Sequence, residues 1–178
     1  GLPPFEDNGF SEYFGVPREQ LFQSIYGEYA ESAKKDFEAY YHENHLSEMV
    51  VLNGVQRLLD TILELKIQMG VVSNKKASFL HQEVKYLGWD KYFGEHVIGA
   101  GDAKADKPDP APLRMAIEKI EKLQPKDVWY IGDTSIDYEC SSRAGTQCIL
   151  VKSPENTSNF RVHVKNYEEI CGFLLHCV

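Results

Sequence analysis

The apolar positions divide the chain into a helical first third and a longer part in which helices alternate with short strands. Between Pro17 and Tyr41 the apolar side chains recur at the spacing of two helices, with no strand-like run among them. Pro17 suits the first turn of a helix, and residues 1–12, rich in Pro, Gly, Asp and Asn, favour irregular structure. We therefore predict a small, purely helical subdomain over residues 1–48.

Residues 49–178 follow a different pattern, in which short continuous apolar runs alternate with amphipathic segments. Asn53 is a good N-cap for the first of these segments, which has one apolar face. Buried strands that alternate with helices are typical of an α/β fold whose parallel sheet is covered on both faces. Strands are predicted at residues 67–72, 97–98, 128–131, 147–151 and 162–164, and the later helices at 76–86, 110–122, 135–143 and 167–177.

The negative net charge of the chain argues against partners that are themselves strongly negative. The 178 residues are 43% apolar and 26% charged, which allows a folded core, and their net charge is −8. An acidic chain has no electrostatic attraction to nucleic acid or to an anionic membrane, so neither is predicted as a partner. No apolar run approaches the ~18 residues of a membrane span, and the first residues lack the pattern of a signal peptide. A phosphorylated ligand would need local basic groups or a metal.

The cysteines lack the spacing of a metal site or of a CxxC motif. We interpret Cys140, Cys148, Cys171 and Cys177 as reduced thiols of a cytoplasmic protein, most of them in the core. No motif around any of them indicates a catalytic nucleophile.

Ser73 and Asn74 form the first candidate pair for a ligand site. In an open parallel sheet the ligand lies beyond the carboxyl ends of the strands, and these two residues stand at a predicted strand-to-helix turn. With the free N–H groups of the following helix, a hydroxyl and an amide could bind a phosphate. The alternative is an ordinary helix cap, which is the commoner use of Ser and Asn there.

Lys107 lies in a proline-rich loop before another predicted helix. Asp109 and Pro110 form an N-cap and first-turn pair for that helix. Pro108 restricts the direction of Lys107, and a rigidly presented ammonium suits a dianionic phosphoryl group. Taken alone, the lysine would be better explained as a surface residue of a proline-rich loop.

The apolar run 128–131 ends in Gly132 and Asp133, and Asp137 follows within the first turn of the next helix. A carboxylate at a strand end, with a second one nearby, suits Mg²⁺, which prefers hard oxygen ligands. Helix capping by an acid would explain Asp137, but it explains Asp133 at the end of a strand poorly. Asp133 is therefore the predicted metal ligand.

These features, in this order, resemble the haloacid dehalogenase superfamily, in particular its phosphoglycolate-phosphatase-like branch. The second, third and fourth motifs of that family are matched by Val-Val-Ser73-Asn74, Lys107-Pro-Asp-Pro and Gly-Asp133-Thr-Ser-Ile-Asp137. The resemblance covers residues 50–151, and residues 1–48 resemble the mobile helical cap by position and pattern. It implies a Rossmann-like core over residues 49–178.

The resemblance implies two-step phosphoryl transfer from a small phosphorylated metabolite. One aspartate would attack phosphorus to form an aspartyl-phosphate, and another would protonate the leaving group. Ser73 would bind the phosphoryl oxygens, assisted by Asn74. Lys107 would stabilise the charge, and Asp137 would orient the lysine or support the metal site indirectly. Asp133 would ligate Mg²⁺, which bridges phosphate and carboxylates.

The first motif of the family, an apolar strand ending in Asp-x-Asp-Gly-Thr, is missing from this sequence. The nearest likeness, residues 5–10, has no apolar strand before it and is interpreted as a surface loop. In the family that strand is central, so without it two inner strands would lack a ladder partner. Because the sequence starts with Gly1 and not Met, we expect the strand to lie upstream; the alternative is a second chain. The chain as given is expected to be inactive.

Other functions stay open from the sequence. Within the same fold, a sugar-phosphate mutase or a pyrophosphatase would use the same motifs. A non-catalytic protein that binds a phosphate ligand or a partner is less consistent with Ser73, Lys107 and Asp133 together, because no structural need explains all three. A phospho-acceptor receiver domain would need an acidic cluster at the end of its first strand, and it has no helical cap. Binding of a dinucleotide is poorly supported, because no GxGxxG motif follows any predicted strand.

Overall fold

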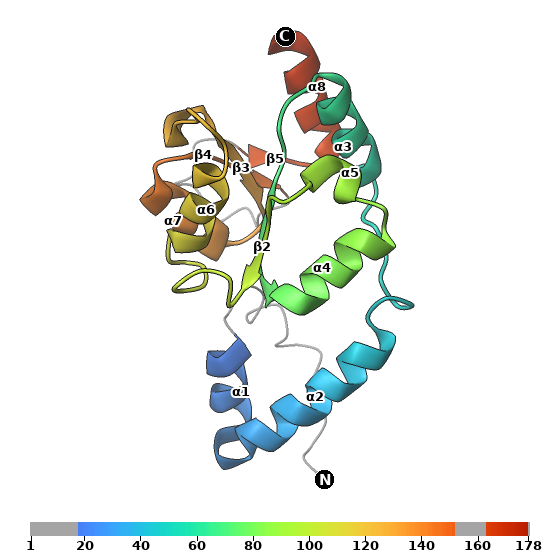
Figure 1. The fold of residues 1–178 in the computed structure, drawn as a ribbon, viewed down its shortest axis with the longest axis vertical. Coiled ribbons are helices and arrows are strands. Elements are labelled where there is room, and N and C mark those ends of the chain that lie inside the picture. Colours follow the sequence, from blue (N-terminus) through green and yellow to red (C-terminus); the bar gives the residue numbers. More distant parts are fainter. Residues whose placement is uncertain (1–17, 152–162, 178) are drawn as a thin grey trace.

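The structure, a computed structural model, describes residues 18–151 and 163–177, and its strands alternate with helices (Figure 1). The strands are β1 (Val71–Lys76), β2 (Val97–Ala100), β3 (Trp129–Gly132), β4 (Gln147–Val151) and β5 (His163–Val164). The helices are α1 (Arg18–Tyr26), α2 (Ala30–Asn44), α3 (Val55–Glu64), α4 (Ala77–Tyr86), α5 (Asp90–Phe93), α6 (Ala111–Glu118), α7 (Ser135–Ala144) and α8 (Tyr167–Cys177), with 3-10 turns η2 (Gly27–Tyr29) and η3 (Pro125–Asp127).

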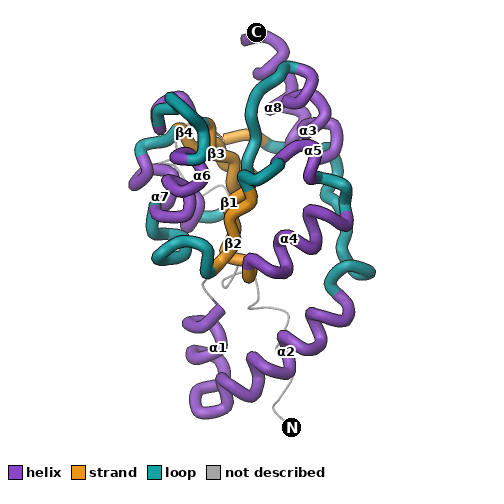
Figure 2. The backbone as a smooth tube through the Cα atoms, viewed as in Figure 1, coloured by secondary structure: helices purple, strands orange, loops and turns teal. Residues whose placement is uncertain are grey.

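The strands form two parallel sheets, β1–β2 and β3–β4–β5. Val71 pairs with Val97 in the first sheet, and Ile131 pairs with Ile149 in the second. Among the described residues, β1 and β3 each have a ladder partner on one side only. Figure 2 shows both sheets running through the middle of the molecule, between the helices. The predicted α/β fold with parallel strands is confirmed.

Buried apolar side chains hold the helices against the sheets. Three clusters join α3 and α8 to β4 and β5, α4 and α5 to β2, and α6 and α7 to β3. Ile98, Leu150 and Ile170 are almost completely buried. A fully buried aliphatic side chain of this size contributes roughly 1.5–3 kcal/mol to folding. These clusters therefore fix the strands and helices on or beside which the candidate residues lie.

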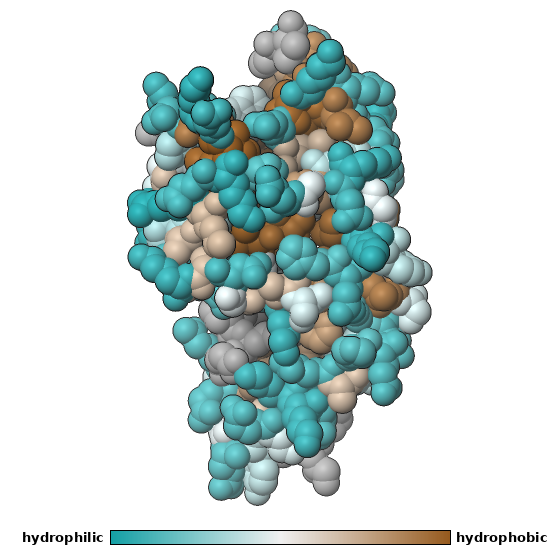
Figure 3. All heavy atoms as spheres, viewed as in Figure 1, coloured by the Kyte–Doolittle hydropathy of each residue, from teal (hydrophilic) through white to brown (hydrophobic). Residues whose placement is uncertain are grey.

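Helices α1 and α2 extend away from the sheets in Figure 1. On the face seen in Figure 3 this part is mostly hydrophilic, whereas apolar side chains gather over the sheet region and near α3 and α8. Phe22 of α1 packs on Phe37 of α2, and Tyr41 of α2 packs edge-on against Phe79 of α4. Aromatic contacts thus connect the helical part to the core. The division of the chain at residue 48 stays a prediction.

Strand β1 differs from its prediction at both ends, and the difference moves two candidate residues. It begins at Val71, which is its first residue to pair with β2, and the chain before it turns at Lys66, where φ is 57°. It continues to Lys76, which pairs with Ala100 of β2 after a shift of register between Val72 and Lys76. Ser73 and Asn74 therefore lie within the strand, and the prediction that they follow it was wrong.

Three predicted helix starts are displaced by one residue, and one of them is that of α4, which begins at Ala77. Gly54, not Asn53, is the N-cap of α3, with a φ of 85° that glycine adopts without steric cost. Helix α6 begins at Ala111, whose N–H donates to Asp109 Oδ1 at 2.8 Å, and it ends earlier than predicted, at Glu118. The order of the elements is as predicted.

Candidate active site

Asn74 of β1 fixes the backbone of Lys107. Its Oδ1 accepts a hydrogen bond from the Lys107 N–H at 2.9 Å, and its Nδ2 donates one to the Lys107 carbonyl at 2.9 Å. The Ser73 hydroxyl oxygen accepts a hydrogen bond from the Lys75 N–H at 3.1 Å. Neither Ser73 nor Asn74 caps α4, because its N-cap position is Lys76 and has no side-chain hydrogen bond. The helix-cap alternative was therefore wrong for both residues.

The ammonium of Lys107 is buried against the carboxylate of Asp137. Nζ lies 2.7 Å from Oδ1, and the two side chains are 11% and 7% exposed. Little water reaches the pair, so its electrostatic interaction is stronger than that of a surface pair. Burial acts to raise the pKa of Asp137, but the charge of Lys107 and hydrogen bonds from Lys107 and Thr134 outweigh it and lower that pKa. The fold thus joins residues from two separate motifs.

Asp137 also caps helix α7. Its Oδ2 accepts hydrogen bonds from the Thr134 hydroxyl at 2.7 Å and from the Thr134 N–H at 3.1 Å. The Thr134 hydroxyl oxygen in turn accepts one from the Asp137 N–H, which completes a capping box. The two interpretations of Asp137 are compatible, because one oxygen serves the helix and the other serves the lysine.

Asp133 is exposed at the end of β3, beside Asp137. Its N–H donates to Asp137 Oδ2 at 3.3 Å, and its carboxylate forms no ion pair within the described part of the chain. Although the residue is exposed, the surrounding protein displaces part of the water around its carboxylate, and this desolvation together with the charge of Asp137 raises the pKa of Asp133. The end of β3 can lie this close to Asp137 because residue 132 is glycine: a Cβ there would lie 2.4 Å from the Asp137 Cβ.

The carboxylate oxygens at the end of β3 are the type of ligand that a hard divalent cation prefers, but there are too few of them to hold the ion alone. Mg²⁺ binds through one or two carboxylates together with waters and phosphate oxygens. Asp133 offers an unpaired carboxylate, and a neighbouring cation would favour its charged form. Over residues 18–151 and 163–177, no group of three His, Cys, Asp or Glu side chains could hold a metal. At least one further oxygen ligand would have to come from elsewhere.

Comparison with known proteins identifies the family. The family model of haloacid dehalogenase-like hydrolases matches residues 1–151. The chain belongs to this family. Pyrophosphatase PpaX of Bacillus velezensis is 27% identical over 135 residues, which are 76% of this chain and 62% of the relative. A phosphoglycolate phosphatase of Pasteurella multocida is 30% identical over 132 residues, which are 74% of this chain and 57% of the relative. The aligned part thus spans less than two thirds of either relative.

The fold of this haloacid dehalogenase-like hydrolase is also found in a crystal structure from Haemophilus somnus described as a predicted phosphoglycolate phosphatase. The TM-score is 0.86 at 21% identity, over 98% of this chain and 84% of that chain. At this identity the likeness shows the fold alone. The resemblance drawn from the three motifs is confirmed at the level of the family.

Tyr130 of β3 contacts both residues of the Lys107–Asp137 pair. It was not among the residues predicted from the sequence. It is 8% exposed, and its hydroxyl donates to Asp137 Oδ1 at 3.1 Å and accepts from Lys107 Nζ at 3.2 Å. The available signal was a phenol within an otherwise apolar strand, because a buried tyrosine hydroxyl usually has a hydrogen-bond partner. That signal does not identify the partner.

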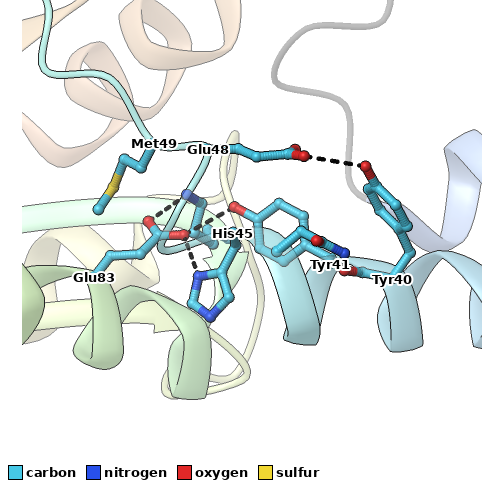
Figure 4. Close-up of a pocket in the computed structure, with 8 residues that line it drawn as sticks. Tyr40, Tyr41, His45, Glu48, Met49 and Glu83 are labelled. Atoms are coloured by element: carbon cyan, nitrogen blue, oxygen red, sulfur yellow. Dashed lines mark hydrogen bonds and ion pairs between the residues drawn. The ribbon is translucent and has the colours of Figure 1, made fainter.

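A second polar cluster of this family member lies where α2 meets the core (Figure 4). The Glu83 carboxylate of α4 accepts hydrogen bonds from Tyr41 at 2.9 Å and from His45 at 3.0 Å, and it pairs with Lys75 of β1. A cavity of about 260 Å³ is lined by these side chains together with Tyr40, Asn44, Glu48 and Met49. None of the predicted site residues lines it. The sequence offered no signal for this cluster.

Cys140, which is buried, and Cys148, which is half-buried, are unsuited to nucleophilic catalysis. Burial raises the pKa of Cys140 and that of Cys148 to about 11 each. Both thiols are therefore protonated near neutral pH, and the thiolate is the nucleophilic form. Cys171 is also a free, buried thiol.

Proposed function

We propose that this protein is a Mg²⁺-dependent phosphatase that hydrolyses a small phosphate monoester through an aspartyl-phosphate. The proposal is carried by the Lys107–Asp137 pair, a buried ammonium beside the exposed carboxylate of Asp133. A fixed positive charge in this position suits the charge of a transferring phosphoryl group. Two relatives named as a phosphoglycolate phosphatase and a pyrophosphatase support phosphoryl chemistry.

In this proposal each candidate residue has one task. The Ser73 hydroxyl donates a hydrogen bond to a phosphoryl oxygen, and Lys107 stabilises the negative charge of the nucleophile and the phosphoryl group. Asn74 holds the backbone of Lys107, and Asp137 holds its ammonium. Asp133 is the ligand for Mg²⁺. When bound, the ion neutralises negative charge on phosphate and carboxylates.

The nucleophilic aspartate is proposed to come from a further strand between β1 and β3. Each of these strands has one ladder partner among the described residues, and the Tyr130 hydroxyl lies 3.5 Å from the Val72 carbonyl of β1. A strand between them would complete both ladders and end beside Lys107 and Asp133. Residues 5–10, the nearest likeness to the missing motif, lie outside the described residues.

A pyrophosphatase activity at the same site is the second candidate. It is favoured by the relative named pyrophosphatase PpaX, with which 135 residues align. The two activities differ in the leaving group, which is inorganic phosphate in one case and an alcohol in the other. Turnover of inorganic pyrophosphate and of phosphoglycolate by the same preparation separates them.

The decisive experiment uses the product of the complete natural gene. We expect it to hydrolyse para-nitrophenyl phosphate with Mg²⁺ and to lose that activity with EDTA. Asp133→Asn should lower kcat by at least about 100-fold, because the proposed metal ligand is lost. Asp90→Asn, which changes an exposed carboxylate in the first turn of α5, is the matched control and should have wild-type activity.

Three results would contradict the proposal. One is an upstream coding region without a strand that ends in Asp-x-Asp. Another is a complete protein that turns over no phosphate monoester. The last is an Asp133→Asn variant as active as Asp90→Asn, which would remove Asp133 from the metal site. The 178-residue chain alone is expected to be inactive in the same assay.

The proposed partner is a small phosphorylated metabolite, and nucleic acid is not among the proposed partners because the net charge is −8. Of the helices that the structure describes, none is long and apolar enough to cross a membrane. Free thiols at Cys140, Cys148 and Cys171 suit a reducing compartment, so we propose that the protein acts in the cytoplasm.

A further inference from the structure

Tyr130 lies within hydrogen-bonding distance of both members of the buried ion pair. Its hydroxyl oxygen is 3.2 Å from Lys107 Nζ and 3.1 Å from Asp137 Oδ1, and the residue is 8% exposed. We propose that Tyr130 is a positioning residue that sets the direction of the Lys107 ammonium. The inference rests on the proposed phosphatase function for its effect on turnover, whereas the contact between Tyr130 and Lys107 can be tested independently.

Only one arrangement of protons satisfies all three groups. The carboxylate of Asp137 can only accept hydrogen bonds, and the ammonium of Lys107 can only donate them. Tyr130 must therefore donate to Asp137 and accept from Lys107. Burial, aided by the charge of Asp137, raises the pKa of Tyr130 well above its ordinary range, so the phenol retains the proton. The Val72 carbonyl, 3.5 Å away, is the longer contact for the same proton.

This arrangement leaves one direction for Lys107 to act on a ligand. Asn74 fixes the backbone of Lys107 through two hydrogen bonds. Asp137 and Tyr130 take two of the three N–H groups of the ammonium, and no third acceptor is found among the residues that the structure describes. Because an ammonium is tetrahedral, two fixed N–H groups determine the direction of the third. Without the phenol, the ammonium could rotate about its contact with Asp137.

Tyr92 provides a matched comparison for Tyr130. It is 6% exposed, and its hydroxyl likewise contacts a carboxylate, that of Asp60, and also accepts from Gln56 Nε2. Tyr92 belongs to α5 and packs in a different apolar cluster from Tyr130. Tyr92→Phe therefore removes a buried hydroxyl of the same kind without touching Lys107 or Asp137.

The first test is steady-state kinetics of the complete protein with para-nitrophenyl phosphate. Tyr130→Phe keeps the aromatic ring and removes only the hydroxyl. We expect kcat to fall about tenfold while KM stays within about twofold, because the group lost is a hydrogen bond to a charged side chain. Tyr92→Phe should leave both constants within about twofold. A kcat of Tyr130→Phe no lower than that of Tyr92→Phe would overturn the proposal.

The second test does not need activity. Ammonium groups held in internal hydrogen bonds exchange slowly enough with water to give ¹H–¹⁵N signals, and the Lys107 signal is assigned by its absence in Lys107→Met. We expect this signal to be lost in Tyr130→Phe and kept in Tyr92→Phe, and its persistence in Tyr130→Phe would refute the contact. If wild-type protein has no turnover but the signal responds as expected, the phosphatase proposal fails and the positioning of Lys107 stands.

Discussion

The side-chain amide of Asn74 and the main chain of Lys107 are joined by two hydrogen bonds, each 2.9 Å long. An amide side chain can both donate and accept, so it satisfies the N–H and the carbonyl of one residue together. Asn74 belongs to β1, whereas Lys107 lies 33 residues later in the loop before α6. The loop therefore takes its position from the strand and not from its prolines alone.

Asn74→Ala is expected to loosen this loop. Both backbone groups of Lys107 lose their partner, so the free energy of unfolding should fall by about 1–3 kcal/mol in urea titrations. In the complete protein kcat should fall more than KM rises, because the ammonium is misplaced. Asn53→Ala, which changes an exposed asparagine before α3, is the control and should alter stability by less than about 0.5 kcal/mol. Equal effects of the two variants would mean that another contact holds the loop.

Gly132→Ala is expected to displace Asp137 of the candidate site or the backbone beside it. The new Cβ would lie 2.4 Å from the Asp137 Cβ, so the backbone at residue 132 or Asp137 must shift. We expect a loss of stability of about 1–3 kcal/mol from this overpacking, measured by urea unfolding. The same change at Gly172 of α8 meets no atom within 4 Å and should be neutral or stabilise by up to about 1 kcal/mol. Similar results at both positions would show that the close approach at Gly132 is unimportant.

The sequence was sufficient to predict the α/β order, but not the contacts between the candidate residues. Asp133 and Asp137 could be placed because an apolar strand followed by a helix leaves few positions for the turn between them. The position of Ser73 was wrong because the bounds of β1 depend on its ladder with β2, which is set by tertiary pairing. Tyr130 was missed because its partners come from other segments of the chain, and a single apolar strand gives no sign of them.

The Lys107–Asp137 pair is expected to show strong energetic coupling. Asp137→Asn leaves a buried ammonium without its counter-charge and should lower the free energy of unfolding by about 3–5 kcal/mol. Lys107→Met leaves a buried carboxylate, and the double variant leaves neither charge. The double variant should therefore be more stable than the sum of the single effects predicts, by roughly 1–3 kcal/mol. Urea unfolding of the four proteins measures this coupling, and strictly additive effects would contradict it.

Glu83 connects the helical part to the core through partners on two other segments. Its carboxylate accepts from Tyr41 and His45 at the end of α2, and it pairs with Lys75 of β1 (Figure 4). Burial acts to raise the pKa of Glu83, but the hydrogen bonds from Lys75, His45 and Tyr41 outweigh it and lower that pKa. The folded state therefore favours the charged carboxylate.

This lowered pKa makes the contribution of Glu83 to stability depend on pH. For a carboxyl whose pKa is lower in the folded state, the stabilisation is complete above the ordinary pKa, here 4.5, and is lost as the pH falls through the lower folded value. Glu83→Gln should therefore lower the free energy of unfolding by about 2–4 kcal/mol at pH 7, and by progressively less below pH ~4.5. Glu48 is an exposed glutamate of the same cavity, and among the described residues its carboxylate accepts a hydrogen bond only from Tyr40, so Glu48→Gln should show no such trend. Urea unfolding between pH 3 and 7 measures both differences, and a Glu83→Gln difference that stays constant over this range would show that the charge of Glu83 does not fasten α2 to the core.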